Sequence, residues 1–225
     1  MTSSQINLTA RIERWPISGG FAISRGSKTE AIVIVAELCI GEQTGRGECV
    51  PYPRYSETPE ATLEAVRSVG QWLSHGGNRQ QLQTAMPAGA ARNAIDCALW
   101  DLEAKQSGRR AWEAIGAGAP RALTTAYTIS LGTPEAMTEA TSKAAHRPLL
   151  KIKLGGDGDV ARIAAVRKAA PHANLIVDAN EAWTDADLER NLDACAAAGV
   201  TLVEQPLPAG HDQALARIKR PIAVC

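Results

Sequence analysis

Residues 149–180 read LLKIKLGGDGDVARIAAVRKAAPHANLIVDAN, which predicts a strand, a helix and a second strand within 32 residues. The two predicted strands, 149–154 and 174–177, are short and rich in leucine, isoleucine and valine, as buried strands are. The predicted helix, 160–170, fills the space between them. A strand, a helix and a strand in this order form the crossover unit of a parallel sheet.

The same alternation continues on both sides of this unit and accounts for residues 121–225. It predicts five strands, at 124–130, 149–154, 174–177, 200–203 and 222–225. The helices between them are expected at 134–146, 160–170, 185–198 and 212–218. Strands at this rhythm imply parallel pairing with helical crossovers.

Residues 1–120 have a different pattern and predict a separate α+β domain. Two strand candidates, 6–15 and 31–40, flank a glycine- and serine-rich stretch at 18–27 that we expect to be a loop. Helices are expected at 60–73 and 88–106. Glycine, alanine and proline then cluster ahead of residue 121, where we place the boundary between the domains.

Charged residues close three successive strands of the second part. Lys151 and Lys153 belong to the first, Asp178 and Asn180 to the next, and Glu204 to the third. Lys153, Asp178 and Glu204 follow one another at intervals of 25 and 26 residues, about one strand–helix unit each. They should therefore sit on neighbouring strands at the same edge of the sheet, where barrel enzymes carry their chemistry. The competing interpretation is that they are ordinary solvated charges.

This arrangement predicts a metal-assisted acid–base site. Aspartate and glutamate are hard oxygen ligands that suit Mg²⁺. Alternation along the strand places Lys151 and Lys153 on one face. Two lysines near each other and near a divalent cation disfavour their own protonated forms, so one should have a lowered pKa and act as a base.

Composition and charge exclude several classes of protein. Lysine and arginine number 24, as do aspartate and glutamate, so the formal net charge is zero and we expect neither a nucleic acid nor a membrane as partner. The five cysteines show no CxxC spacing, which argues against a zinc site or a disulfide framework. The polar first ten residues lack the apolar run of a signal peptide, so we expect a cytoplasmic protein with a small-molecule substrate.

Further residues allow two interpretations each. Arg25, Tyr52 and Tyr55 lie on glycine- or proline-bounded stretches, where they are either substrate contacts or ordinary surface residues. The glycine-rich residues 155–158 precede a helix and form either a phosphate cradle or, because they lack a known phosphate-binding pattern, a flexible loop. Trp183 either packs in the core or touches the site.

Six motifs carry a resemblance to a known family. They are FAISRGS at 21–27, GECVPYPRY at 47–55, AGAARNAIDCALWD at 88–101, KIK at 151–153, DANEAW at 178–183 and VEQPLP at 203–208. Together they resemble the enolase superfamily, its muconate-lactonising subgroup and, within it, the dipeptide epimerases of the L-Ala-D/L-Glu type. The resemblance implies a capping domain, 1–120, followed by a (β/α)₇β TIM-like barrel that begins at residue 121.

The resemblance also implies a function. It implies an isomerase that removes the proton next to a dipeptide carboxylate, passes through an enediolate and reprotonates the other face, with one Mg²⁺ per active site. Carried over by position, Lys153 is the acid/base and Lys151 its electrostatic neighbour. Asp178 and Glu204 are metal ligands, and Asn180 supports the metal site and the substrate.

The capping domain contributes the remaining implied contacts. Arg25 would bind the anionic end of the substrate, and Tyr52 and Tyr55 would shape the pocket. Members of the superfamily often form oligomers, so a homo-oligomer is also expected. Two other functions stay open: muconate cycloisomerisation or o-succinylbenzoate synthesis on the same scaffold, and a truncated, non-catalytic remnant.

The family pattern extends beyond residue 225. It places a third acidic metal ligand just past the fifth strand, a second catalytic lysine on the sixth, and an acidic pair for the substrate's ammonium group on the eighth. Five predicted strands cannot close an eight-stranded barrel. We therefore expect residues 121–225 to form an incomplete barrel and residues 1–225 alone to be inactive.

Overall fold

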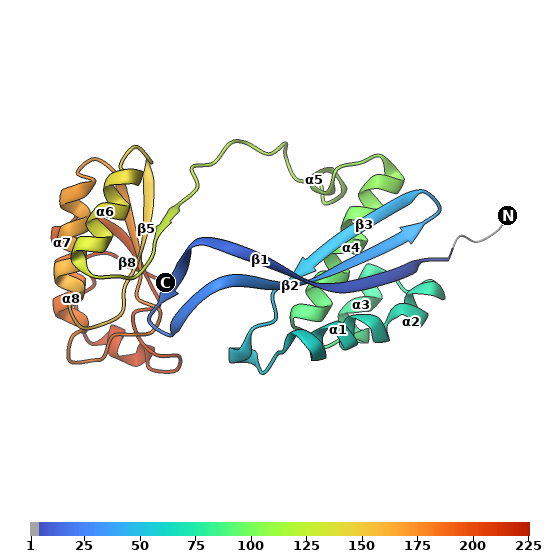
Figure 1. Ribbon diagram of the computed structural model, residues 1–225, viewed down its shortest axis with the longest axis horizontal. Helices are drawn as coiled ribbons and strands as arrows, with labels where there is room; N and C mark the ends of the chain where they lie inside the picture. Colours follow the sequence, from blue (N-terminus) through green and yellow to red (C-terminus); the bar gives the residue numbers. More distant parts are fainter. Residues whose placement is uncertain (1–4) are drawn as a thin grey trace. The chain divides into compact units, whose positions relative to one another are not determined.

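The computed structural model describes residues 5–225, so the first four residues of the predicted capping domain lie outside it. The chain divides into two compact units (Figure 1). The first contains residues 5–17 and Glu30–Arg121, and the second contains Ser18–Thr29 and Ala122–Cys225. Residues 18–29, which are predicted to be part of the capping domain, fall in the second unit. In the part of the chain described, no helix combines the length and apolar character that crossing a membrane requires.

A three-stranded sheet in the order β1–β2–β3 organises the first unit. Its strands are β1 (Asn7–Ile23), β2 (Gly26–Ile40) and β3 (Gln43–Cys49), and β2 pairs with β3 antiparallel. The prediction of a loop at 18–27 is wrong, because β1 and β2 both extend into these residues and only Ser24 and Arg25 form the turn between them. Gly19 and Gly20 have φ values of +74° and +70°, which glycine adopts without strain, so the strand bends there without ending.

Helices cover this sheet. They are α1 (Pro59–Ser68), α2 (Gly70–Ser74), α3 (Arg79–Ala85), α4 (Ala90–Ser107) and α5 (Ala111–Ala114), with a 3₁₀ turn η1 (Pro53–Tyr55). Helix α4 lies against β3 because Gly45 and Gly47 allow it: a Cβ on Gly47 would stand 1.9 Å from the carbonyl oxygen of Ala94. The helix expected at 60–73 is interrupted at Val69, and α3 was not predicted, although the capping box of Asn78 and Gln81 marks its start.

The second unit is a five-stranded parallel sheet in the order β4–β5–β6–β7–β8. Its strands are β4 (Tyr127–Ile129), β5 (Leu149–Lys153), β6 (Asn174–Asp178), β7 (Val200–Glu204) and β8 (Ala223–Val224). The connections contain α6 (Pro134–Ala144), α7 (Asp159–Ala169), α8 (Leu188–Ala197) and the 3₁₀ helix η2 (Asp212–Ala216). The prediction of five parallel strands from an incomplete barrel is confirmed.

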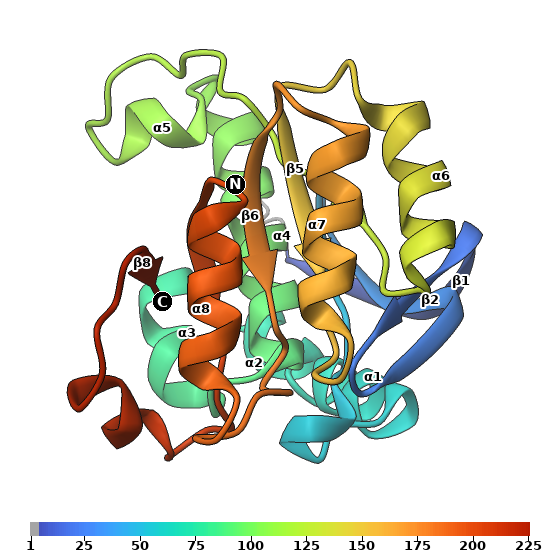
Figure 2. The same ribbon diagram turned by 90° about the vertical axis from the view of Figure 1, so that its left-hand side faces the viewer.

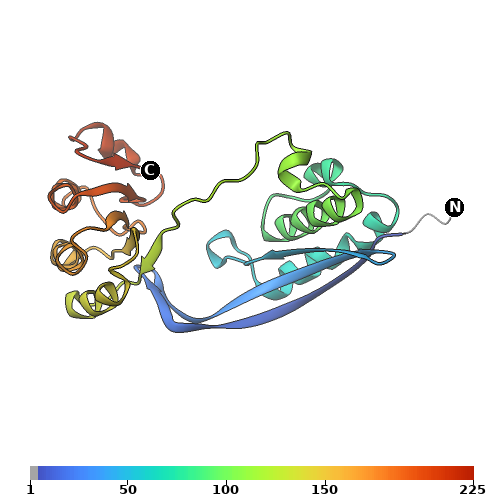
Figure 3. The same cartoon turned by 90° about the horizontal axis from the view of Figure 1, so that it is seen from above.

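The helices and the sheet of this unit bury one continuous core. Figures 2 and 3 show α6, α7 and α8 side by side along one face of the strands. Ile152 on β5, Val177 on β6 and Val203 on β7 are each at most 1% exposed and contribute to this core. Their burial fixes the register of the strands, because a shift of one residue would turn them away from the helices.

Candidate active site

The register of the parallel sheet brings the charged strand ends together. Lys153 on β5 pairs with Asp178 on β6, and Asp178 pairs with Glu204 on β7. Neighbouring strands lie close enough for side chains at paired positions to touch. The structure therefore places Lys151, Lys153, Asp178 and Glu204 side by side at the carboxyl edge of the sheet, and we call these four residues the strand-end cluster.

The cluster contains two cations and two anions in direct contact. Lys153 Nζ donates a hydrogen bond of 2.5 Å to Asp178 Oδ2, and both residues are under 10% exposed. Lys151 Nζ lies 3.3 Å from the same oxygen and also donates to Glu204. Mutual compensation of this kind is what allows ionised groups to be buried.

These contacts set the protonation of the cluster. Burial acts to lower the pKa of Lys151, but the hydrogen bond to Glu204 and the charges of Asp178 and Glu204 outweigh it and raise that pKa. Burial likewise acts to raise the pKa of Asp178, but Lys153 outweighs it and lowers that pKa. The groups facing the Lys151 ammonium are carboxylates, so the lowered lysine pKa that we expect beside a bound divalent cation stays a prediction.

The backbone beyond the cluster is held in an uncommon conformation. Asn180, Glu181 and Gln205 have φ values of +49°, +66° and +46°, a region that costs energy for residues other than glycine. Ala179 N donates to Glu204 O at 3.0 Å and Glu181 N donates to Gln205 O at 2.7 Å. The segments that follow β6 and β7 are thus joined to each other, and the strain is concentrated beside Asp178 and Glu204.

The turn between β1 and β2 also belongs to this unit and contacts the site. Arg25 donates to Asn180 O at 2.8 Å and pairs with Glu181 at 3.1 Å, and Ser24 Oγ donates to Asn180 O at 2.9 Å. Lys153 Nζ lies 5.7 Å from the centroid of the Phe21 ring. Arg25 is therefore bound to the segment that follows β6, which begins beside Asp178. Its predicted contact with a substrate stays a prediction.

The donor atoms of the site suit a hard divalent cation. Asp178 and Glu204 offer carboxylate oxygens at paired positions. Asn180 N donates to Asp178 Oδ1 at 2.9 Å, while the side-chain oxygen of Asn180 is buried and has no hydrogen-bond partner among residues 5–225. A buried oxygen without a partner is costly unless a ligand completes it. The same stretch, residues 5–225, contains no group of three acidic, histidine or cysteine side chains placed to hold a metal.

Tyr52 and Tyr55 lie in the first unit. Their ring centroids are 6.1 Å apart, and both line a cavity of about 560 Å³ together with Glu57 and the start of α4. Glu57 accepts hydrogen bonds from Tyr52 N and Ala90 N, which fixes the tyrosine segment to α4. The structure does not bring the two tyrosines and the strand-end cluster into one unit, so their role as substrate contacts stays a prediction.

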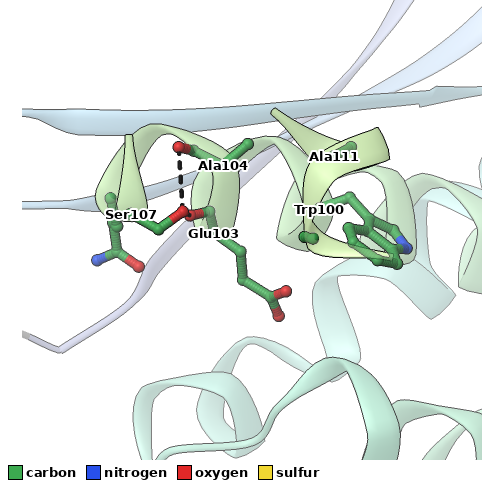
Figure 4. A pocket seen from close by; sticks show the side chains of 7 residues that line it. Trp100, Glu103, Ala104, Ser107 and Ala111 are labelled. Atoms are coloured by element: carbon green, nitrogen blue, oxygen red, sulfur yellow. Dashed lines mark hydrogen bonds between the residues drawn. The ribbon is translucent and has the colours of Figure 1, made fainter. Parts of the chain in front are cut away.

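A second cavity of the first unit carries no catalytic arrangement. It measures about 450 Å³ and lies between α4 and α5, where Ser107 donates to the carbonyl oxygens of Glu103 and Ala104 (Figure 4). Glu103 is the one ionisable residue of its lining, and Arg79 pairs with it at 3.2 Å.

One buried charged residue was not predicted. Asp159, the first residue of α7, is 1% exposed and accepts hydrogen bonds from Gly155 N, Gly156 N and Trp183 Nε1. A phosphate cradle at 155–158 is wrong, because the amides that would bind a phosphate donate to this carboxylate. Two glycines ahead of a helix that begins with aspartate are the signal in the sequence. Trp183 is fully buried, as its interpretation as a core residue required.

Both units match known domain families. Residues 5–116 match the mandelate racemase / muconate lactonizing enzyme N-terminal domain, and residues 135–225 match the enolase C-terminal domain-like family. The L-Ala-D/L-Glu epimerase of Escherichia coli is 43% identical over 215 residues, which cover 95% of this chain and 67% of the relative. The N-acetyl-D-glutamate racemase of a Pseudoalteromonas species is 41% identical over 195 residues, covering 86% and 62%.

Solved structures agree with these matches. An enolase family member from Agrobacterium tumefaciens, described as bound to sodium and L-Ala-L-Glu, is 50% identical with a TM-score of 0.95, covering 98% of this chain and 68% of that one. A dipeptide epimerase from Enterococcus faecalis, described as complexed with Mg and L-Leu-L-Tyr, is 27% identical with a TM-score of 0.86, covering 98% and 66%. The chain thus spans about two thirds of the length of these proteins. It belongs to the enolase superfamily, in the mandelate racemase and muconate-lactonizing branch that includes the dipeptide epimerases.

Proposed function

We propose that the protein containing this chain is a Mg²⁺-dependent dipeptide epimerase whose substrates are L-Ala-L-Glu and L-Ala-D-Glu. The observation that carries the proposal is the strand-end cluster, in which Lys153, Asp178 and Glu204 occupy paired positions at the carboxyl edge of a parallel sheet. The relatives described above as dipeptide epimerases support the substrate class.

Lys153 would exchange a proton with the carbon next to the substrate's carboxylate. Its amine form removes that proton and its ammonium form delivers one, so the residue serves one face of the carbon. The hydrogen bond to Asp178 and the burial of the side chain restrict where Nζ can move. Restricting the reacting nitrogen in this way lowers the entropic part of the barrier.

Lys151 would act electrostatically beside this group. Its ammonium faces Glu204 and Asp178, so it adds positive charge at the point where the substrate's carboxylate would become more negative. Asp178 and Glu204 would hold the metal, and the unpartnered side-chain oxygen of Asn180 would support it or the substrate. When bound, Mg²⁺ supplies charge that offsets the negative charge developing on the substrate carboxylate.

Arg25 would recognise the anionic end of the dipeptide. Its guanidinium is about one-third exposed in its pair with Glu181, so a substrate carboxylate can compete for it. Tyr52 and Tyr55 would shape the pocket. The five cysteines of the chain are free, which suits a reducing cytoplasm, where we place the protein. We expect residues 1–225 on their own to be inactive, because they provide two of the three expected acidic metal ligands.

The test is proton exchange in D₂O with L-Ala-L-Glu and Mg²⁺, on the full-length protein that contains this chain. With L-Ala-L-Glu and L-Ala-D-Glu assayed separately, the glutamyl α-proton should exchange with solvent, and Lys153→Ala should slow the exchange of the one epimer whose α-proton faces Lys153 by a factor of about 10²–10⁴. Lys143→Ala, which removes an exposed lysine of α6, should leave it unchanged. Exchange of both epimers that is undiminished in Lys153→Ala, or the absence of exchange with every Ala-Xaa dipeptide, would refute the proposal.

Two substrate comparisons and one metal titration separate the alternatives. Faster exchange with N-acetyl-L-glutamate than with L-Ala-L-Glu would favour N-acylamino acid racemisation, which the relative from Pseudoalteromonas makes a specific competitor. Turnover of muconate or of an o-succinylbenzoate precursor would instead favour the other reactions of the scaffold. A calorimetric titration with Mg²⁺ that shows no binding would favour a non-catalytic remnant.

A further inference from the structure

Asp159 is a buried carboxylate that the proposed mechanism does not use. Its side chain is fully shielded from solvent. It accepts hydrogen bonds from Gly156 N at 2.7 Å, Trp183 Nε1 at 2.8 Å and Gly155 N at 3.1 Å, and it pairs with Arg162 at 2.9 Å. Burying an ionised carboxylate is costly unless it is compensated in this way, so the arrangement is strongly specified.

The groups that Asp159 binds come from the segments that follow the catalytic strands. Gly155 comes two residues after Lys153, and Trp183 comes three residues after Asn180. Trp183 N donates in turn to Pro206 O at 3.0 Å, two residues beyond Glu204. A single carboxylate therefore joins the chain leaving β5 to the chain leaving β6 and, through Trp183, to the chain leaving β7.

The glycine loop is shaped to make this junction. Gly156 has a φ of +99°, and a Cβ there would stand 3.2 Å from Ala182 O. A Cβ on Gly155 would stand 2.7 Å from the side chain of Leu131. Both amides donate to Asp159, and Gly156 does so in a backbone conformation that only glycine adopts without strain, while at Gly155 a side chain would crowd Leu131. The flexible loop expected at 155–158 is better described as a loop fixed from within by Asp159.

We propose that Asp159 is a positioning residue, which holds the ends of β5, β6 and β7 in the register that lets Lys153 meet Asp178. The proposal rests on the proposed function for the roles of those two residues. Asp159 does not contact the substrate; it acts through the loop after Lys153 and through Trp183. Displacements of about 1 Å at a reacting group can lower a rate about 100-fold, so a residue of this kind affects turnover.

The kinetic test uses three variants of the full-length protein and one matched control. Trp183→Phe removes the indole donor of the bond to Asp159. Asp159→Asn removes the negative charge and one of the two acceptor oxygens that hold Gly155, Gly156, Trp183 and Arg162, so it weakens the same junction, and the double variant weakens that junction only once. Arg167→Lys is the control, because Arg167 is a partly buried residue of the same helix, near its other end, and donates to main-chain carbonyls there. Each variant is assayed for α-proton exchange of L-Ala-L-Glu, with kcat and KM determined separately.

Asp159→Asn should lower kcat by about 10- to 100-fold and Trp183→Phe by about 3- to 10-fold, with KM changed less than about threefold. The double variant should be no more than about threefold slower than Asp159→Asn, because both substitutions act on one junction. Arg167→Lys should keep the kcat of the parent at temperatures where it is folded. Equal losses of kcat in Asp159→Asn and Arg167→Lys would overturn the proposal.

Amide hydrogen exchange gives a readout that does not depend on turnover. Leu154 N donates to Asp178 O and Ala179 N donates to Glu204 O, both at 3.0 Å, next to the catalytic positions. Asn174 N donates to Pro148 O at the opposite end of the sheet. Asp159→Asn or Trp183→Phe should speed amide hydrogen exchange at Leu154 and Ala179 at least tenfold more than at Asn174. Arg167→Lys should instead speed amide exchange more at Asn174 than at Leu154 and Ala179.

The two readouts separate the proposals from each other. If the parent protein exchanges no dipeptide α-proton, the proposed function fails while amide exchange still tests the positioning role. If Leu154 and Ala179 keep their protection in both variants, the positioning role fails whatever the activity is. Should Asp159→Asn not fold, Trp183→Phe decides the question, because it keeps the carboxylate and a buried aromatic ring while removing the indole's hydrogen bond to Asp159.

Discussion

Arg167 should be a major source of stability in the second unit. Its guanidinium donates to Ala198 O at 2.6 Å, Ala173 O at 2.8 Å and Ala170 O at 3.1 Å, all partly buried, and to the more exposed Pro171 O and Gly199 O at 3.2 and 3.4 Å. Burial lowers the pKa of Arg167, which shows that the group is partly desolvated. It therefore ties the end of α7 to the end of α8 and to the start of β6.

Arg167→Met keeps an apolar stem and removes every one of these bonds. Counting about 1 kcal/mol for each of the three partly buried bonds gives a loss of about 3 kcal/mol in the free energy of unfolding. For a chain of this size that corresponds to a fall of about 6–12 °C in Tm.

Urea and thermal unfolding, followed by far-UV circular dichroism, measure both quantities. Lys143→Met is the control, because its pair with Glu139 is on the surface of α6 and should contribute nothing measurable. If Arg167→Met lowers the free energy of unfolding by less than about 1 kcal/mol, Arg167 is not a major source of stability, because water then replaces its hydrogen bonds at little cost.

Two further predictions concern ionisable side chains of the first and second units. Burial raises the pKa of Cys49 to about 11 and that of Cys195 to about 12. A disulfide reagent at pH 8 should therefore label the exposed Cys225 at once, and should label Cys49 and Cys195 only after denaturation. Rapid labelling of Cys49 or Cys195 in the folded protein would contradict this. Burial acts to raise the pKa of Asp101, but Lys105 and Arg46 N outweigh it and lower that pKa. The stabilisation is therefore present above about pH 4 and is lost as the pH falls through the lower folded-state pKa. Asp101→Asn should be less stable than the parent at pH 6, and the difference should shrink as the pH is lowered.

The sequence predicted the second unit well because its signals are local and periodic. Short apolar strands recur at one strand–helix interval, and that interval alone places Lys153, Asp178 and Glu204 at one edge of a parallel sheet. These three residues could be predicted to be neighbours without any knowledge of side-chain packing. Successive parallel strands joined by helical crossovers pair side by side, and residues one strand–helix unit apart then lie at the same end of the sheet.

Other features depend on partners that are distant in the chain. Residues 18–27 have the composition of a loop, and their pairing as strands becomes visible only when β1 and β2 are placed side by side. Asp159 looks like an ordinary acid in the first turn of a helix, and its burial depends on Trp183, 24 residues further on. The raised pKa of Lys151 depends on Glu204, 53 residues away.

The turn between β1 and β2 has a consequence for how this protein can be recombined. Residues 18–29 are encoded within the first unit yet complete the second, where Ala22 O accepts from Leu131 N and where Ser24 and Arg25 donate to Asn180 O. A chimaera joined at residue 121 would pair one parent's turn with the other parent's strand ends. A chimaera that takes its barrel from a relative should be active only if residues 18–29 come from the same relative. The second unit is therefore encoded by two separate stretches of the gene.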